Sequence, residues 1–233
     1  MMRKADPMKV VVTGASGLVG RALTDRLREG GHEPIRVGRS RSSDIVWDPE
    51  NGELDSRQLE GTNAVVHLAG ENIASGRWTG RVKERILESR TRGTSLLSRT
   101  LAGLHDKPGV VVSASAIGYY GDRGSERLDE QASAGVGFLP GVCRDWESAT
   151  EPVRIAGIRL VTMRTGVVLA RQGGALARMI TPFRLGVGGS SVSDRRGPAS
   201  RYGPCQRTAS IRRERGWCRR LAGDSPEWRS SPD

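Results

Sequence analysis

Two kinds of hydrophobic pattern alternate along most of this chain. Compact apolar runs predict strands at residues 10–13, 32–39, 45–47, 65–69, 110–113 and 158–164. Between them, apolar residues recur every three or four positions and predict helices at residues 21–30, 79–104 and 139–156. Strands that alternate with helices are typical of a parallel sheet with both faces covered. We therefore predict an α/β fold with a doubly wound parallel sheet, whose ligands bind beyond the carboxyl ends of the strands.

Three glycines directly follow the first predicted strand. They stand three residues apart, and a predicted helix begins immediately after them. Glycines at this spacing let the backbone turn sharply and let a pyrophosphate approach its amide groups, while the helix N-terminus adds unpaired N–H donors. Because strand, turn and helix occur in the required order, we predict a dinucleotide site formed by Gly14, Ser16, Gly17, Leu18, Val19 and Gly20. A βα turn that serves packing alone is the alternative.

The end of the second predicted strand bears on which dinucleotide is bound. An acidic residue there would accept hydrogen bonds from the ribose hydroxyls of NAD, but this chain has Gly38, Arg39, Ser40 and Arg41. Arginine supplies donors and positive charge for a 2′-phosphate. We therefore expect NADP in preference to NAD, with Arg39 as the leading contact and Gly38 and Ser40 beside it. The alternative is a basic loop that contacts only solvent.

Polar residues also stand near the ends of two later strands. His67 lies inside a predicted strand, so we interpret it as a histidine packed in the core. Ser115 follows the strand at residues 110–113, and Tyr119 and Tyr120 come shortly after it. A serine at a strand end is able to hydrogen-bond a substrate carbonyl, and a phenol is able to exchange a proton with substrate. Ser115, Tyr119 and Tyr120 are therefore the candidate catalytic residues.

Composition narrows the remaining possibilities. The chain has 233 residues and a formal net charge of +11, of which the segment from Ser190 contributes +5 through ten arginines and five acids. Its hydrophobic fraction of 36% is low for a globular chain, so some segment is expected to add little core. Three cysteines without a C-x-x-C pair, and three histidines, give little support for a zinc site. No metal ligands are therefore proposed.

Targeting signals are not evident in the sequence. No apolar run approaches the length needed to span a membrane. The N-terminus is charged but has no apolar signal core, so we expect a cytoplasmic protein. The expected partner is a small-molecule substrate, with neither a membrane nor a nucleic acid favoured.

Several motifs, taken in order, resemble those of extended short-chain dehydrogenases/reductases. They are Thr13-Gly14-x-x-Gly17-x-x-Gly20, residues 67–70, Ser115 with Tyr120-Gly121, and residues 164–167. Residues 68–73, Cys143-x-x-Trp146-Glu147, residues 164–169 and residues 182–189 look like an atypical subgroup, the "epimerase family proteins" of the NAD-dependent epimerase/dehydratase type. The resemblance covers about residues 8–189 and implies a Rossmann-type, NADP-binding domain. The end of the strand at residues 65–69 is expected to pass along the cofactor with Leu68, Ala69, Gly70 and Glu71, and the resemblance implies that Arg90, Gly166 and Val167 line it too.

One departure from the extended family concerns acid–base chemistry. Extended members use Tyr-x-x-x-Lys, in which the lysine lowers the pKa of the tyrosine so that it trades a proton with substrate. The corresponding positions here hold Leu139 and Cys143, and neither residue is able to act in that manner. The atypical subgroup lacks the pair as well. Ser115 with Tyr119 or Tyr120 is the candidate substitute.

A second departure begins at Ser190. Where the family continues with a substrate-binding lobe, this chain has an Arg/Ser/Gly/Pro-rich segment at residues 190–233 without defensible periodicity. Three interpretations compete: a disordered basic tail, a divergent lobe, and a segment translated out of frame. The abrupt change just inside a family motif favours the frameshift. We therefore assign a cofactor-binding domain to residues 1–189 and a tail, expected to be disordered, to residues 190–233.

Two functions from different classes follow. The first is an NADP-dependent oxidoreductase or nucleotide-sugar-type epimerase (an isomerase) that exchanges a hydride with a carbonyl or sugar-like substrate. The second is a catalytically silent NADP-binding sensor or scaffold. The glycine turn is compatible with both, while the missing Tyr-x-x-x-Lys pair favours the second.

Overall fold

A computed structural model describes residues 6–73 and 77–170, together with Gly173, Gly174, Leu176, Ile180 and Arg184. All of them belong to one compact unit, Met1–Asp194. The predicted domain boundary at Ser190 and the arginine-rich tail lie outside the described residues.

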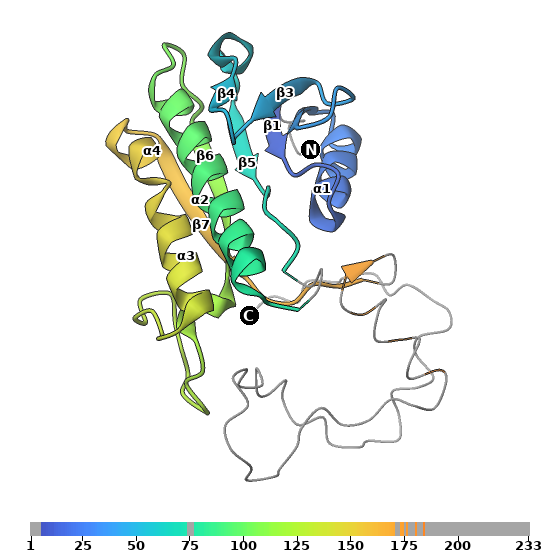
Figure 1. The fold of residues 1–233 in the computed structure, drawn as a ribbon. Coiled ribbons are helices and arrows are strands. Elements are labelled where there is room, and N and C mark those ends of the chain that lie inside the picture. Colours follow the sequence, from blue (N-terminus) through green and yellow to red (C-terminus); the bar gives the residue numbers. More distant parts are fainter. Residues whose placement is uncertain are drawn as a thin grey trace, which may run out of the picture. The chain divides into compact units, whose positions relative to one another are not determined.

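Strands and helices alternate in the described part of the chain (Figure 1). The strands are β1 Lys9–Thr13, β2 Glu33–Gly38, β3 Ile45–Asp48, β4 Glu53–Leu54, β5 Ala64–His67, β6 Val110–Ala116, β7 Arg159–Thr165 and β8 Leu169–Ala170. The helices are α1 Leu18–Glu29, α2 Gly80–Ala102, α3 Phe138–Ser148 and α4 Glu151–Ile155, with short 3-10 helices η1 Ser56–Leu59 and η2 Ile117–Tyr120. Each of the six predicted strands corresponds to one of these strands.

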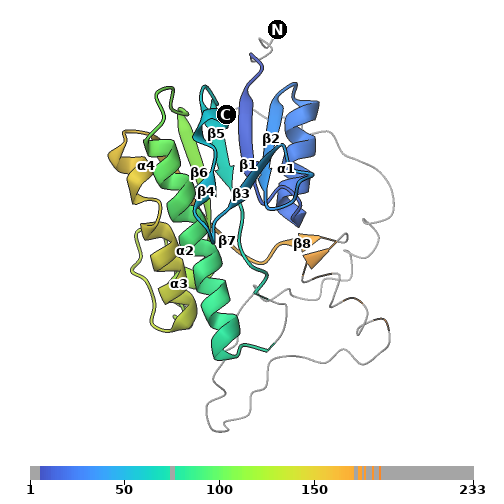
Figure 2. The same cartoon turned by 45° about the horizontal axis from the view of Figure 1, so that its top comes forward.

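The strands β1 to β7 form one sheet in the order β4-β3-β2-β1-β5-β6-β7. Every neighbouring pair is parallel except β3 with β4, which is antiparallel. From β1 the chain passes through α1 to β2 and continues toward one edge of the sheet. From β5 it passes through α2 to β6, and then through α3 and α4 to β7 at the opposite edge. Because such crossovers are right-handed, the reversal puts α1 and the group α2–α4 on opposite faces (Figure 2). The predicted doubly wound, Rossmann-type fold is confirmed.

The sequence prediction was wrong about the region after β6. One helix was predicted at residues 139–156, but the structure has two, α3 and α4. Pro152 has no N–H to donate to a carbonyl four residues earlier, so a continuous helix would lose a hydrogen bond there. Instead Thr150 ends the first helix with its hydroxyl donating to the Glu147 carbonyl at 2.6 Å, and Pro152 occupies the first turn of the second. The two-residue strand β4 was not predicted because two residues carry no periodicity.

The core lies between the sheet and helix α2. Val11, Val65 and Val111 come from neighbouring strands and belong to one hydrophobic cluster with Leu97 and Leu101 of α2, and all five are buried. Each such side chain contributes about 1.5–3 kcal/mol through burial. This packing holds β1, β5 and β6 side by side, so that the segments after their carboxyl ends share one edge of the sheet.

Candidate functional site

The glycine turn between β1 and α1 requires glycine for reasons that the structure makes explicit. Gly14 has φ +68°, and a Cβ there would stand 2.8 Å from the Leu68 carbonyl oxygen of the segment after β5. A Cβ on Gly20 would overlap the Gly14 carbonyl oxygen, so the helix packs closely on the turn. The Gly17 amide closes the turn by donating to that same oxygen at 2.9 Å. Turn, close approach and helix packing are the three roles that dinucleotide turns assign to their glycines.

The N-terminus of α1 is suited to a phosphate. Gly17 occupies the N-cap position in an extended conformation, no described side chain caps the helix, and its first turn contains no acidic residue. Ser16, Gly17 and Val19 are exposed at this end and Leu18 is half-buried. The first N–H groups of a helix have no intrahelical acceptor, and the helix dipole is positive here. These residues therefore fit the pyrophosphate of a dinucleotide, and no described capping side chain would have to move to admit it.

The segment after β2 carries the residues expected to select NADP. Gly38 ends the strand, and Arg39 and Ser40 follow it as exposed residues. Ser40 is held in a turn, because its hydroxyl lies 3.0 Å from that of Ser42 and its carbonyl accepts from the Ser43 amide at 3.0 Å. Hydrogen bonds from Asn51 lower the pKa of Asp48 most, and the positive charge of Arg39 lowers it slightly further. Arg39 therefore lies at the carboxyl edge of the sheet with its side chain in solvent.

Residues 68–71, which follow β5, form a second wall beside the glycine turn. The Thr13 hydroxyl oxygen, at the end of β1, accepts hydrogen bonds from the amides of Leu68 at 3.1 Å and Ala69 at 3.2 Å. Thr13 is fully buried, whereas Leu68 and Ala69 are half-buried and Gly70 is exposed. One buried hydroxyl thus fixes this segment against the strand that carries the glycine turn.

Arg90 supports the same wall from helix α2. Its Nη2 donates to the Glu71 carbonyl at 3.0 Å and its Nη1 to the Ile86 carbonyl at 3.1 Å. The guanidinium also stacks on the Trp146 ring, with its central carbon 5.1 Å from the ring centre. Burial lowers the pKa of Arg90 from its ordinary value, because the charged form is desolvated. Arg90, expected among the cofactor-lining residues, therefore contacts the backbone of the segment that would line the cofactor.

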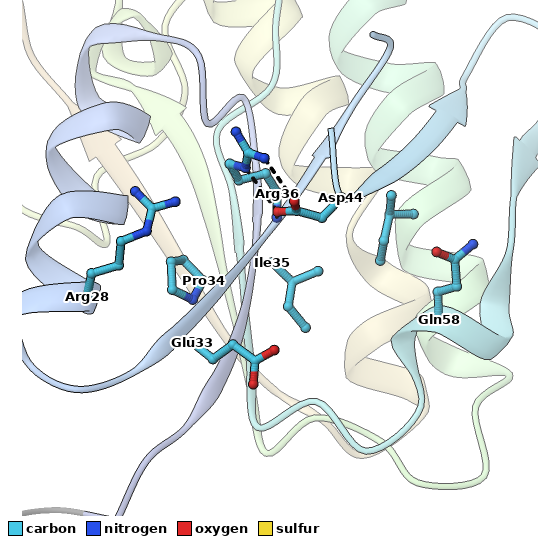
Figure 3. Close-up of a pocket in the computed structure, with 8 residues that line it drawn as sticks. Arg28, Glu33, Pro34, Ile35, Arg36, Asp44 and Gln58 are labelled. Atoms are coloured by element: carbon cyan, nitrogen blue, oxygen red, sulfur yellow. Dashed lines mark hydrogen bonds and ion pairs between the residues drawn. The ribbon is translucent and has the colours of Figure 1, made fainter. Parts of the chain in front are cut away.

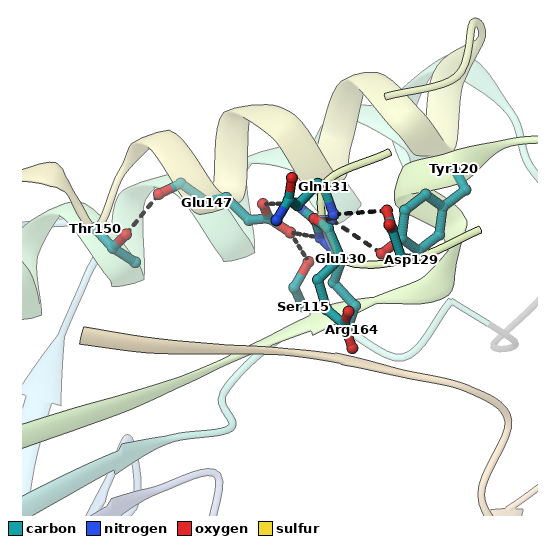
Figure 4. Close-up of polar contacts among 8 residues, drawn as sticks. All are labelled: Ser115, Tyr120, Asp129, Glu130, Gln131, Glu147, Thr150 and Arg164. Carbon is teal, nitrogen blue, oxygen red and sulfur yellow. Dashed lines mark hydrogen bonds and ion pairs between the residues drawn. The ribbon is translucent and has the colours of Figure 1, made fainter. Parts of the chain in front are cut away.

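Ser115, the first candidate catalytic residue, belongs to a polar cluster at the ends of β6 and β7 (Figure 4). Its hydroxyl donates to Glu147 Oε1 at 2.6 Å, and Ser115 is 2% exposed. Arg164 holds the same carboxylate with two parallel hydrogen bonds, Nε to Oε1 at 2.9 Å and Nη2 to Oε2 at 2.8 Å. This ion pair and its hydrogen bonds raise the pKa of Arg164. Ser115 thus donates to a carboxylate that a guanidinium also holds with two charge-assisted hydrogen bonds.

The two candidate tyrosines contact the same arginine. Arg164 Nη1 donates to the Tyr120 hydroxyl at 3.1 Å and to the Glu130 carbonyl at 3.0 Å. Its central carbon lies 3.5 Å from the ring centre of Tyr119, a close cation–π contact. The structure therefore brings Ser115, Tyr119 and Tyr120 together through Glu147 and Arg164.

Glu147 was not among the predicted site residues. The positions of the missing Tyr-x-x-x-Lys pair, Leu139 and Cys143, lie four residues apart, and Glu147 continues this spacing along α3. Leu139 and Cys143 both face η2, since a Cβ on Gly118 would meet them at 3.5 and 3.7 Å. Burial raises the pKa of the Cys143 thiol, so it stays protonated. Helical spacing of four was the signal in the sequence that points to Glu147.

The segment after β7 crosses the same edge of the sheet. Gly166 and Val167 directly follow the strand and are exposed, Val167 by 67%. A Cβ on Gly166 would lie 3.6 Å from Ile117, and one on Gly173 would lie 3.6 Å from Leu18 of α1. The chain therefore runs from the end of β7 past η2 to the N-terminus of α1, which brings it beside the glycine turn.

A separate open pocket of about 570 Å³ lies at the amino half of β2 (Figure 3). It is lined by Arg28, Glu33, Pro34, Ile35, Arg36, Asp44, Ile45 and Gln58. Arg36 is engaged there by Asp44, with its Nε donating at 2.9 Å and its Nη2 at 2.8 Å, and this contact lowers the pKa of the carboxyl group. The pocket is therefore distinct from the carboxyl edge where the candidate site lies.

The described residues contain no cluster of three His, Cys, Asp or Glu residues able to hold a metal ion. Within the same part of the chain, no helix combines the length and apolar character that crossing a membrane requires.

Comparison with known proteins agrees with this geometry. Residues 10–136 match the model of the NAD dependent epimerase/dehydratase family. An epimerase family protein from Mycobacterium bovis is 43% identical over 189 residues, which cover 80% of this chain and 62% of that protein. The structure of human epimerase family protein SDR39U1 with NADPH has 33% identity and a TM-score of 0.68, covering 78% of this chain and 61% of the human one.

A bacterial structure is similar to the same degree. The nucleoside-diphosphate sugar epimerase of Corynebacterium glutamicum has 42% identity and a TM-score of 0.67, covering 76% of this chain and 38% of that one. The chain thus spans less than two thirds of the length of each of these three relatives.

Proposed function

Since this chain belongs to the NAD dependent epimerase/dehydratase family, we propose that it binds NADPH at the carboxyl edge of its sheet. The observation that carries the proposal is the glycine turn, in which Gly14 and Gly20 leave no room for a side chain and no described side chain caps the N-terminus of α1. Gly17, Leu18 and the amides around them would hold the pyrophosphate. Segments 68–71 and 166–167 would flank the nicotinamide half.

NADPH is proposed over NADH because of the residues after β2. Arg39 and Ser40 are exposed at the end of that strand, where a 2′-phosphate would lie, and the turn 38–41 contains no carboxylate that would repel it. The human relative whose structure contains NADPH supports the same preference.

For the activity, we propose an oxidoreductase or epimerase that acts on a carbonyl or sugar-like substrate. A bound nicotinamide supplies or accepts the hydride in such reactions. Ser115, Tyr119 and Tyr120 are our candidates for the accompanying proton, since the hydroxyl of Ser115 is already hydrogen-bonded to a carboxylate at 2.6 Å. Glu147 would then receive or return that proton through Ser115, while Arg164 stabilises its charge.

A catalytically silent NADPH-binding protein is the second candidate, and the cluster around Arg164 favours it. Arg164 donates to Glu147, to Tyr120 and to the Glu130 carbonyl, so its guanidinium is engaged by protein acceptors. Leu139 and Cys143, at the positions of the usual acid–base pair, have no group that titrates for this purpose.

Fluorescence titration of the full chain with NADPH and NADH tests the binding proposal. We expect micromolar affinity for NADPH and at least tenfold weaker binding of NADH. Failure to bind either nucleotide would contradict the proposal altogether. Loss of NADPH absorbance with a panel of carbonyl and nucleotide-sugar substrates then separates the two candidates, because the silent protein binds NADPH without oxidising it.

A further inference from the structure

Helix α2 contacts the cofactor wall, residues 68–71, through polar side chains. The Glu71 amide donates to Ser89 Oγ at 3.1 Å, and Arg90 Nη2 donates to the Glu71 carbonyl. One turn further along α2, Thr94 Oγ1 lies 2.8 Å from Nε2 of His67, the last residue of β5. Three side chains of one helical face therefore contact the wall and the residue immediately before it.

The hydrogen bonds around His67 have only one consistent direction. Thr13 Oγ1 accepts from the amides of Leu68 and Ala69, so its single proton is available for His67 Nδ1, 2.7 Å away. Nδ1 of His67 is then an acceptor, and the ring carries its proton on Nε2 and donates it to Thr94. Burial lowers the pKa of His67 to about 4, so the ring is neutral at physiological pH. The chain Thr13–His67–Thr94 thus has defined donors and acceptors throughout.

Helix α2 is itself fixed where these contacts occur. A Cβ on Gly93 would lie 3.3 Å from the ring of Trp47, so helix and sheet are in close contact beside Thr94. Trp47 packs edge-on against His67, with ring centres 6.2 Å apart. Ser89 Oγ donates to the Ile86 carbonyl at 3.1 Å, which orients its lone pairs toward Glu71. The polar side chains therefore have little freedom to follow a displaced wall.

The position of the wall matters because it touches the glycine turn. The Leu68 carbonyl oxygen stands 2.8 Å from the place a Cβ of Gly14 would occupy, so the two backbones are in contact. A shift of residues 68–71 by a fraction of an ångström would press on the turn or leave a gap beside it. The cofactor would contact both.

We propose that Ser89, Thr94 and His67 are positioning residues for the cofactor: they fix residues 68–71 against the glycine turn and thereby set the affinity for NADPH. His67 and Thr94 are each 1% exposed, so they would act on the cofactor through the wall rather than by direct contact. The inference rests on the proposed function, since it concerns the same site. Loss of one of these contacts allows the wall to adopt other positions. The apparent affinity for NADPH then falls in proportion to the fraction of molecules that remain competent to bind.

Substitutions at Thr94 test the proposal in the full chain. Thr94→Val keeps the shape but removes the acceptor for His67 Nε2, and we expect about fivefold to tenfold weaker NADPH binding by fluorescence titration. Thr94→Ser restores the acceptor and is expected to bind within about twofold of the wild type. Thr100→Val is the matched control, because the Thr100 hydroxyl donates to the Leu96 carbonyl within its own helix. It is expected to leave the affinity unchanged.

Two further measurements cover the case in which Thr94→Val does not fold. Ser89→Ala removes the acceptor for the half-buried Glu71 amide and is expected to weaken NADPH binding about threefold to fivefold. Nitrogen-15 NMR reads the His67 tautomer directly, since the chain has three histidines and His67→Gln assigns its signal. We expect the proton on Nε2 with and without NADPH.

The outcomes separate the inference from the function it rests on. A wild-type chain that binds no NADPH contradicts both. A wild type that binds, with Thr94→Val and Ser89→Ala equally tight, overturns the inference alone. Thr94→Ser as weak as Thr94→Val, or a proton on Nδ1 of His67, also overturns it, because the hydrogen-bond chain would not then be the cause.

Discussion

Glu147 of α3 and Arg164 of β7 form a bidentate ion pair although they are 17 positions apart in the sequence. Both side chains are less than one fifth exposed. The pair joins α3, the helix that carries Leu139 and Cys143, to β7 at the edge of the sheet. The Ser115 hydroxyl donates to the same carboxylate. One carboxylate thereby holds together helix α3 and the strands β6 and β7.

Removal of this carboxylate should destabilise the fold. Glu147→Gln leaves Arg164 partly buried without its counter-charge, and we expect a loss of about 2 kcal/mol in the free energy of unfolding. Urea denaturation measures it. Glu151→Gln is the matched control, because Glu151 pairs with Arg154 on the surface and is expected to show no measurable change. Equal effects of the two substitutions would show that the pair at Arg164 has no special role.

At the glycine turn, the cost of backbone strain at positive φ can be separated from the cost of a steric clash with a neighbouring backbone. Gly14 and Gly52 both have positive φ, +68° and +74°, but only Gly14 faces a neighbouring backbone. Gly52→Ala should therefore cost only the conformational strain, about 1–2 kcal/mol. Gly14→Ala adds a clash with Leu68 and should cost about 3 kcal/mol or more, with NADPH binding lost. Thermal or urea unfolding together with the fluorescence titration measures both; similar costs would contradict the close approach at Gly14.

Arg39 is expected to determine the cofactor preference. Arg39→Gln removes the charge proposed to contact the 2′-phosphate, so the affinity for NADPH should fall about tenfold while that for NADH changes little. Arg41→Gln is the control, because Arg41 is also exposed, stands two residues from Arg39 and carries the same charge. A similar loss in both variants would indicate a general attraction to anions, and this would weaken as salt is raised.

Stability should depend on pH through His67. In the unfolded chain a histidine is protonated as the pH falls through 6.5, whereas buried His67 accepts a proton only near pH 4. Between these values the unfolded state binds more protons, so acidification favours unfolding. The contribution is complete above about pH 6.5 and falls by about 3 kcal/mol as the pH approaches 4.

Urea unfolding at a series of pH values between 7.5 and 4.5 measures this dependence. His67→Gln is less stable overall but has no such group, so its stability should decline less steeply over the same range. Parallel curves for the two proteins would show that His67 titrates normally in the folded state.

Much of the fold was predictable because local pattern determined it. The apolar runs at residues 10–13 and 110–113 predict buried strands, and their alternation with helical periodicity predicts a parallel sheet. The helix at 139–156 was mispredicted since its apolar spacing continues through Pro152, and periodicity does not register a missing N–H. For the site, the glycine spacing indicated the turn, while Glu147 escaped because a single charged residue on a helix most often faces solvent.

By itself the sequence determined the local chemistry of this protein: where the backbone must turn without a side chain, and which residues follow each strand. Those are properties of neighbouring residues, and a linear pattern records them. Only the tertiary structure decided which side chains meet across the edge of the sheet. Thr94 contacts the residue before the cofactor wall, His67, and Glu147 links Arg164 to Ser115. These contacts form because β5, β6 and β7 pair in parallel and α2 and α3 pack against the sheet that they form. Contacts between residues that are distant in sequence depend on that packing and have no signature in any one segment.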